Sequence, residues 1–174
     1  VYDIGANVGY FSLLAAELVG SRGQVYAFEP LPRNIAFLRQ HIALNQLTNV
    51  AVVEAAVSDQ NGSAAFDLGA SSAMGHIADQ GAMQVDLVRL DDLLADHQIL
   101  PPDFIKIDVE GTEDAVLRGA QSLITTWRPT LFLDTHQREA HASVIATLQA
   151  WGYTFEILDG KPLPETKELI ARPG

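Results

Sequence analysis

Apolar positions along the chain follow two alternating periods. Short runs rich in β-branched and aromatic residues predict strands, and between them apolar positions three or four residues apart predict helices. The first of these helices, predicted over 7–19, carries Phe11, Leu14 and Leu18 at this spacing. The predicted core strands cover residues 1–4, 24–29, 50–57, 104–109 and 130–135. Strands that alternate with helices indicate a doubly wound, mostly parallel α/β sheet with helices on both faces.

The regular alternation is interrupted over residues 58–90. Two short strands are predicted there, at Ala64–Leu68 and Gln84–Leu90, on either side of a loop of small residues from Gly69 to Gly81. This pattern predicts a small β insertion in the α/β sheet. The loop has two interpretations, a mobile lid over a substrate or an ordinary surface loop, and the sequence leaves both open.

The chain as a whole is interpreted as one domain, residues 1–174, because no composition shift or linker divides it. Near the end, residues 153–158 and 169–171 predict an antiparallel pair that closes the sheet. The chain begins at Val1 inside a predicted strand, so we expect the natural protein to have residues upstream of it.

Charge and composition narrow the classes of partner. The chain has 11 basic and 22 acidic residues, a net charge of −11, and such a surface repels phosphate backbones and anionic lipid headgroups. We therefore expect no nucleic acid and no membrane surface as partners. Cysteine is absent, which excludes disulfides, thiolate metal sites and a cysteine nucleophile, and is compatible with a cytoplasmic location.

The candidate ligand site lies at the end of the first strand. That strand ends in Asp3, and Gly5 and Gly9 stand in the turn that leads into the next helix. In an open α/β sheet, ligands bind at such strand ends, where glycine permits close approach of the backbone. A second acid, Glu29, closes the second strand 20 residues after Gly9, the usual place of a carboxylate that holds ribose hydroxyls.

Two nucleotide-type cofactors compete for this geometry. A dinucleotide fingerprint has a second glycine where this chain has Asn7. The carboxylate of Asp3 would repel a pyrophosphate, whereas it would attract the ammonium and sulfonium groups of S-adenosylmethionine. Charge therefore favours S-adenosylmethionine. An NAD-type oxidoreductase and a non-catalytic domain that binds a cofactor or a partner remain the alternatives.

Three motifs together resemble the FkbM family of methyltransferases. The first runs from Asp3 to Ser12, the second is Phe28-Glu29-Pro30 followed by Asn34, and the third covers residues 104–111, with the sequence FIKIDVEG. The resemblance implies a class I methyltransferase fold, Rossmann-like with seven strands, and S-adenosylmethionine as cofactor. It also implies methyl transfer to a hydroxyl oxygen of a sugar, polyketide or similar small-molecule acceptor.

The resemblance also implies roles for individual residues. Asp3, Gly5 and the backbone from Ala6 to Gly9 would hold the methionine end of the cofactor, Glu29 its ribose, and Ala55 and Ala56 its adenine. The cofactor-binding residues expected in this way are Asp3, Gly5, Ala6, Asn7, Val8, Gly9, Glu29, Pro30, Ala55, Ala56 and Asp108.

The candidate catalytic residues are His136, Asp134 and Glu110, which together with Asp108 stand at the ends of two of the core strands. If these strands are neighbours, all four groups converge beside the methyl donor. An alcohol acceptor must lose its proton to a base or to a metal, and His136 is the leading candidate for the base. Two alternatives stay open: a histidine that is merely hydrogen-bonded, or a divalent metal held by Asp108, Asp134 and His136.

Overall fold

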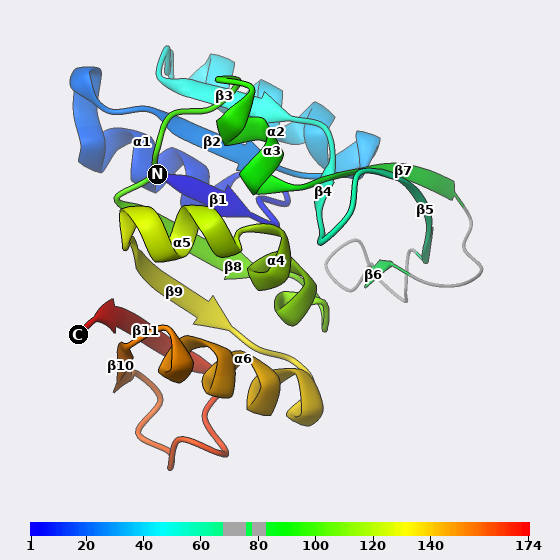
Figure 1. Cartoon of the computed structure of the whole chain (residues 1–174). Coiled ribbons are helices and arrows are strands. Elements are labelled where there is room, and N and C mark those ends of the chain that lie inside the picture. The colour runs from blue at the N-terminus through cyan, green and yellow to red at the C-terminus, as the bar shows by residue number, and fades with distance from the viewer. Residues whose placement is uncertain (68–75, 78–82) are drawn as a thin grey trace.

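A seven-stranded sheet forms the centre of the computed structural model, which describes residues 1–67, 76–77 and 83–174 (Figure 1). Its strand order is β10-β11-β9-β8-β1-β2-β3. The strands are β1 (Tyr2–Ile4), β2 (Val25–Phe28), β3 (Val50–Val53), β8 (Phe104–Asp108), β9 (Thr130–Asp134), β10 (Tyr153–Ile157) and β11 (Glu168–Pro173). All neighbours pair in parallel except β11, which is antiparallel to both β9 and β10. The predicted doubly wound sheet and its antiparallel closing pair are confirmed.

Helices cover both faces of this sheet because successive residues of a strand point to opposite sides. On β2, Phe28 belongs to the large core formed with helices α4, α5 and α6, whereas Ala27 packs in a second core with Leu38 and Leu13 from α2 and α1. The helices are α1 (Tyr10–Val19), the 3₁₀ turn η1 (Gly20–Arg22), α2 (Pro32–Leu44), α3 (Leu90–Ala95), α4 (Glu113–Gly119), α5 (Gln121–Trp127) and α6 (Arg138–Ala150). Among the described residues, no helix has the length and apolar character needed to cross a bilayer.

Helix α1 differs from its prediction in two respects. It begins at Tyr10 rather than at residue 7, because the preceding residues form a turn with positive φ angles. The predicted apolar stripe is not its buried face: Leu14 and Leu18 are 48% and 78% exposed, while Ser12 and Ala16 are buried. Small side chains on the buried face let the helix approach the sheet closely.

A second, four-stranded sheet has the order β4-β7-β5-β6. Its strands are β4 (Ala56–Val57), β5 (Gly62–Asp67), β6 (His76–Ile77) and β7 (Met83–Val88). The single strand predicted over 50–57 was wrong, because the chain leaves the main sheet after Val53 and β4 pairs with β7 instead. The expected lid, 69–81, lies outside the described residues except for 76–77, so its role stays a prediction.

The order in which strands are added to the sheet reverses at β1, and this reversal creates the site. From β1 the chain continues to β2 and β3 on one side, and later returns to β8 and β9 on the other. Connections therefore diverge at the carboxyl ends of β1 and β8, where open α/β sheets bind ligands. Because Ile4 is in register with Phe28 and Ile107, and Asp108 with Asp134, the predicted site residues lie along one edge of the sheet.

Candidate functional site

A hollow of about 710 Å³, open to solvent, lies at the carboxyl edge of the sheet. Polar groups and apolar side chains both face it. Its lining residues are Ile4, Gly5, Asn7, Phe28, Glu29, Pro30, Leu31, Asn34, Ala55, Ala56, Val57, Phe66, Asp108, Val109, Glu110 and Thr112.

The turn between β1 and α1 forms one wall of the hollow. The backbone N–H groups of Gly5 and Ala6 both donate to the carbonyl of Phe28, at 3.1 and 3.0 Å. Gly5 has a φ of +77°, and a Cβ atom there would lie 2.0 Å from the carbonyl oxygen of Asp108. Only glycine fits this position, since it lacks a Cβ atom and tolerates positive φ. Asn7 also has a positive φ, +51°, and asparagine tolerates that conformation better than most residues.

Glu29 is a buried carboxylate, 4% exposed, that faces the hollow. Its Oε2 accepts the backbone N–H of Asn7 at 2.8 Å. Its Oε1 accepts the backbone N–H of Leu31 at 3.0 Å and the side-chain amide N–H of Asn34 at 3.1 Å. Burial raises the pKa of Glu29, and these hydrogen bonds oppose the increase. A carboxylate has about four acceptor positions, so Glu29 retains capacity for one ligand hydroxyl group.

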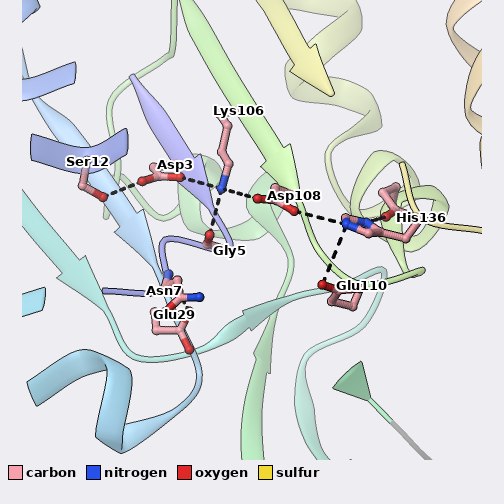
Figure 2. Close-up of polar contacts among 10 residues, drawn as sticks. Asp3, Gly5, Asn7, Ser12, Glu29, Lys106, Asp108, Glu110 and His136 are labelled. Carbon is pink, nitrogen blue, oxygen red and sulfur yellow. Dashed lines mark hydrogen bonds and ion pairs between the residues drawn. The ribbon is translucent and has the colours of Figure 1, made fainter. Parts of the chain in front are cut away.

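Lys106 occupies the centre of a buried ionic network that the sequence analysis did not identify. Its Nζ lies 3.2 Å from Asp3 Oδ1 and 3.2 Å from Asp108 Oδ2, and it donates to the carbonyl of Gly5 at 2.8 Å (Figure 2). Its charge also lies 5.2 Å from the centre of the Phe11 ring, a favourable cation–π distance. The available signal was a lysine in the interior of an otherwise apolar strand.

Asp3 lies beneath the turn rather than in the hollow. It is 1% exposed, and besides Lys106 it accepts the Ser12 hydroxyl at 2.6 Å. S-adenosylmethionine was favoured on the assumption that the Asp3 carboxylate points at the ligand. In the structure, Asp3 is instead paired with Lys106. The carboxylates that do line the hollow are Glu29, Asp108 and Glu110. Direct contact of Asp3 with a cofactor stays a prediction.

A histidine surrounded by carboxylates stands beside the hollow (Figure 2). His136 Nε2 lies 3.7 Å from Asp108 Oδ1 and 3.8 Å from Glu110 Oε1, while its Nδ1 lies 3.2 Å from Glu113 Oε1. The hydrogen bond to Glu113 is the largest of the causes that raise the pKa of His136 to about 9. Burial raises the pKa of the neighbouring Asp134. The fully buried Glu113 was not among the candidate residues, because its position at a helix start resembles an ordinary helix-terminal acid.

The structure therefore brings most of the predicted residues to one edge. Asp134 and His136 do not line the hollow but lie close to Asp108, which does. Ala6, Val8 and Gly9 belong to the turn and do not line the hollow. The predicted residues that line the hollow are Gly5, Asn7, Glu29, Pro30, Ala55, Ala56, Asp108 and Glu110.

The predicted metal ligands also lie close together. One ligand atom from each of Asp108, Asp134 and His136 can be chosen so that all three lie within 4.8 Å of one another. These distances are compatible with a divalent metal bound by the three residues. Lys106 and His136 already provide positive charge to Asp108 in this arrangement.

Comparison with known proteins identifies related sequences. A hexuronic acid methyltransferase, AglP, from Haloferax volcanii is 26% identical over 121 residues, which cover 68% of this chain and 48% of AglP. The 31-O-demethyl-FK506 methyltransferase FkbM of Streptomyces tacrolimicus is 27% identical over 189 residues, 88% of this chain and 72% of that protein. The chain thus spans about half the length of AglP.

Solved structures share the fold. The crystal structure of methyltransferase FkbM from Methylobacillus flagellatus matches 98% of this chain and 42% of its own, with a TM-score of 0.71 and 19% identity. Fibrillarin from Aeropyrum pernix, solved with bound S-adenosyl-L-methionine, matches 98% of this chain and 64% of its own, with a TM-score of 0.57 and 15% identity. The family model described as "Methyltransferase FkbM domain" matches residues 3–155. The chain therefore belongs to the FkbM methyltransferase domain family.

Proposed function

We propose that this domain transfers a methyl group from S-adenosylmethionine to a hydroxyl oxygen of a small-molecule acceptor, such as a sugar. The observation that carries the proposal is the buried Glu29 carboxylate, which faces the hollow beside a glycine turn. Membership of the FkbM family supports methyl transfer as the reaction. Two relatives support the oxygen acceptor through their names, one a hexuronic acid methyltransferase and one a 31-O-demethyl-FK506 methyltransferase.

The groups that line the hollow suit S-adenosylmethionine better than a dinucleotide. Glu29 would accept a ribose hydroxyl, and Ala55 and Ala56 would offer small apolar surfaces to an adenine ring. Asp108 and Glu110 add two further carboxylates to the lining, and negative charge there favours a cationic ligand over a pyrophosphate. The charge of the hollow therefore favours S-adenosylmethionine without requiring contact with Asp3.

The chain's own residues have three tasks in the reaction. S-adenosylmethionine, held by Glu29 and the turn that follows β1, would supply a methyl carbon activated by positively charged sulfur for transfer to the acceptor oxygen. The residues align the two reactants, and Asp134 and Glu110 accept hydrogen bonds from the acceptor. The neutral form of His136, which is the minority form near pH 7 because its pKa is about 9, takes the hydroxyl proton at Nε2.

The acceptor is proposed to be a small molecule, since the net charge of −11 and the acidic site disfavour a nucleic acid. A cytoplasmic location remains a prediction from the absence of cysteine. The divalent metal remains the alternative to His136 for removing the hydroxyl proton.

Calorimetric titration of the whole chain tests the cofactor. We expect S-adenosylhomocysteine to bind with micromolar affinity and NAD⁺ to show no binding. Glu29→Gln should weaken S-adenosylhomocysteine binding by about 10-fold or more, because a hydrogen bond to a charged group contributes about 1.5–3 kcal/mol.

Glu54→Gln is the matched control, because Glu54 follows β3 and pairs with Arg39 on the surface, where removal of an ion pair changes little. Tight binding of NAD⁺ without binding of S-adenosylhomocysteine would refute the proposal in favour of the oxidoreductase. Binding of S-adenosylhomocysteine with no methyl transfer to any hydroxylated acceptor would favour the non-catalytic domain.

A further inference from the structure

The second sheet contributes three side chains to the hollow at the carboxyl edge of the main sheet (Figure 1). Ala56 and Val57 form β4, and Phe66 lies near the end of β5. Phe28 and Phe66 are the aromatic residues among the described lining residues. Phe28 is 1% exposed and belongs to the large core of the main sheet. Phe66 is thus the aromatic ring that the second sheet itself adds to the lining.

A small core, separate from that of the main sheet, holds Phe66 in place. It joins Phe66, which is 6% exposed, to Val85 and Leu87 on β7 and to Leu31. Leu31 stands two residues after Glu29, and its backbone N–H donates to Glu29 Oε1 at 3.0 Å. The ring therefore has a fixed position before any ligand binds, close to the segment that carries Glu29.

Glu29 stands between the glycine turn and this small core. Its Oε2 accepts the N–H of Asn7 in the turn, and its Oε1 accepts that of Leu31, whose side chain packs in the small core. The hollow therefore presents, in order, the turn, a carboxylate and an aromatic ring. The amino acid part, ribose and adenine of S-adenosylmethionine follow one another in the same order. With the ribose at Glu29 and the amino acid part at the turn, the adenine comes to the side of Phe66.

The chemistry of the lining agrees with this order. Most of the lining near the small core is apolar, with Pro30, Leu31, Ala55, Ala56, Val57 and Phe66. An adenine ring is uncharged at neutral pH and stacks on aromatic side chains through its flat faces. The amino acid part carries charges, which are costly to remove from water unless they are paired. An apolar wall therefore suits the base and disfavours the amino acid part.

We propose that the second sheet is part of the cofactor site and that Phe66 forms the wall on which the adenine ring of S-adenosylmethionine stacks. The inference rests on the proposed function. The small core behind Phe66 fixes the ring, so little side-chain freedom is lost when the base binds. Loss of the aromatic face should weaken every ligand that carries the base, whether or not the ligand also carries the amino acid part.

Calorimetric titration of the whole chain with two ligands tests the stacking. S-adenosylhomocysteine carries base, ribose and amino acid, whereas 5′-methylthioadenosine keeps the base and the ribose without the amino acid. Phe66→Leu retains an apolar side chain against the small core and removes the aromatic face. We expect the Kd of both ligands to rise by the same factor, about 3- to 10-fold.

Val85→Ala is the matched control, because Val85 belongs to the same small core and is not among the residues that line the hollow. It should lower the urea midpoint of unfolding and leave both Kd values within about 2-fold of the wild type. If Val85→Ala weakens binding as much as Phe66→Leu, the packing of the second sheet explains the effect and the inference is overturned. Unchanged Kd values in Phe66→Leu, or a rise for S-adenosylhomocysteine alone, would overturn it as well.

Nuclear Overhauser contacts in the wild type decide the question if Phe66→Leu does not fold. We expect contacts between the ring protons of Phe66 and the two ring protons of the bound adenine. Contacts of Phe66 with the amino acid part alone, or none with the ligand, would overturn the inference and leave the proposed function intact, because S-adenosylhomocysteine would still bind. Failure of both ligands to bind the wild type would instead refute the proposed function.

Discussion

Two buried glutamates near the site are held differently, Glu29 in the lining of the hollow and Glu113 against His136. Glu29 receives three hydrogen bonds, two from backbone N–H groups and one from an amide, so its position depends mainly on the path of the chain. Glu113 has one oxygen without a hydrogen-bond partner among the described residues, and its other oxygen accepts one backbone N–H, from Gly111, and contacts a side chain that titrates. Backbone hydrogen bonds do not change with pH, whereas a contact with histidine does. The cofactor side is therefore fixed, and the His136 side can exchange protons.

Mutations on the two sides should differ as well. On the Glu29 side, changes that move the backbone should reduce stability strongly, whereas changes of side chain that leave the backbone in place should act mainly on ligand binding. On the His136 side, individual charged side chains determine the net charge around the imidazole. Replacing one of them should therefore change the properties of the site even when the backbone stays in place. Lys106 joins the two sides through Asp3 and Asp108.

The largest effect is expected from Gly5→Ala, which disturbs the backbone of the cofactor side. The new Cβ would lie 2.0 Å from the carbonyl oxygen of Asp108 at a φ of +77°, so the turn or β8 must move. We expect the free energy of unfolding to fall by more than about 4 kcal/mol, measured by urea denaturation. Gly160→Ala is the control, because Gly160 has a similar φ of +71° with nothing within 4 Å, and should cost about 1–2 kcal/mol. Equal losses in both variants would show that φ strain, and not the contact with β8, determines the cost.

The next effect comes from Lys106→Met, which removes the charge shared by the two sides. Asp3 would be left buried beside the Ser12 hydroxyl alone, and breaking a buried ion pair by removing one partner costs about 3–5 kcal/mol. Urea denaturation at neutral pH measures the loss. Arg39→Met removes an exposed pair with Glu54 and should cost less than about 1 kcal/mol. If Lys106→Met is as mild as this control, the network does not stabilise the site.

Sequence periodicity was sufficient for the main sheet because its central strands, β1, β2 and β8, are mostly buried and so read as apolar runs between helical patterns. It failed where the determinant lies in a distant partner. The segment 50–57 has one continuous β pattern, yet its last residues pair with β7, some 30 positions away in the chain. Similarly, the apolar residues of α1 showed that a helix forms but not which face it buries.

The candidate site was predicted only in outline. Strand ends and glycines are local features of the sequence, so the turn, Glu29 and the acids at the ends of β8 and β9 were proposed as site residues. The partners of Lys106 and Glu113 lie up to 103 positions away in the sequence, as for Lys106 and Asp3. A lysine inside a strand and an acid at a helix start acquire their roles only when the sheet brings those partners together.

The smallest effect should follow Asn7→Gly, which leaves the backbone contact of the cofactor side unchanged. The structure uses the N–H of Asn7, which donates to Glu29 at 2.8 Å, at a φ of +51° that glycine adopts without strain. We therefore expect S-adenosylhomocysteine affinity within about 2-fold of the wild type and stability within about 0.5 kcal/mol, whereas Asn7→Ala should cost about 1 kcal/mol or more. The glycine variant also restores the second glycine of the dinucleotide pattern. Glu29, Asp108 and Glu110 still line the hollow, so NAD⁺ should remain unbound. Binding of NAD⁺ by this variant would mean that the glycine pattern, and not the charge of the hollow, selects the cofactor.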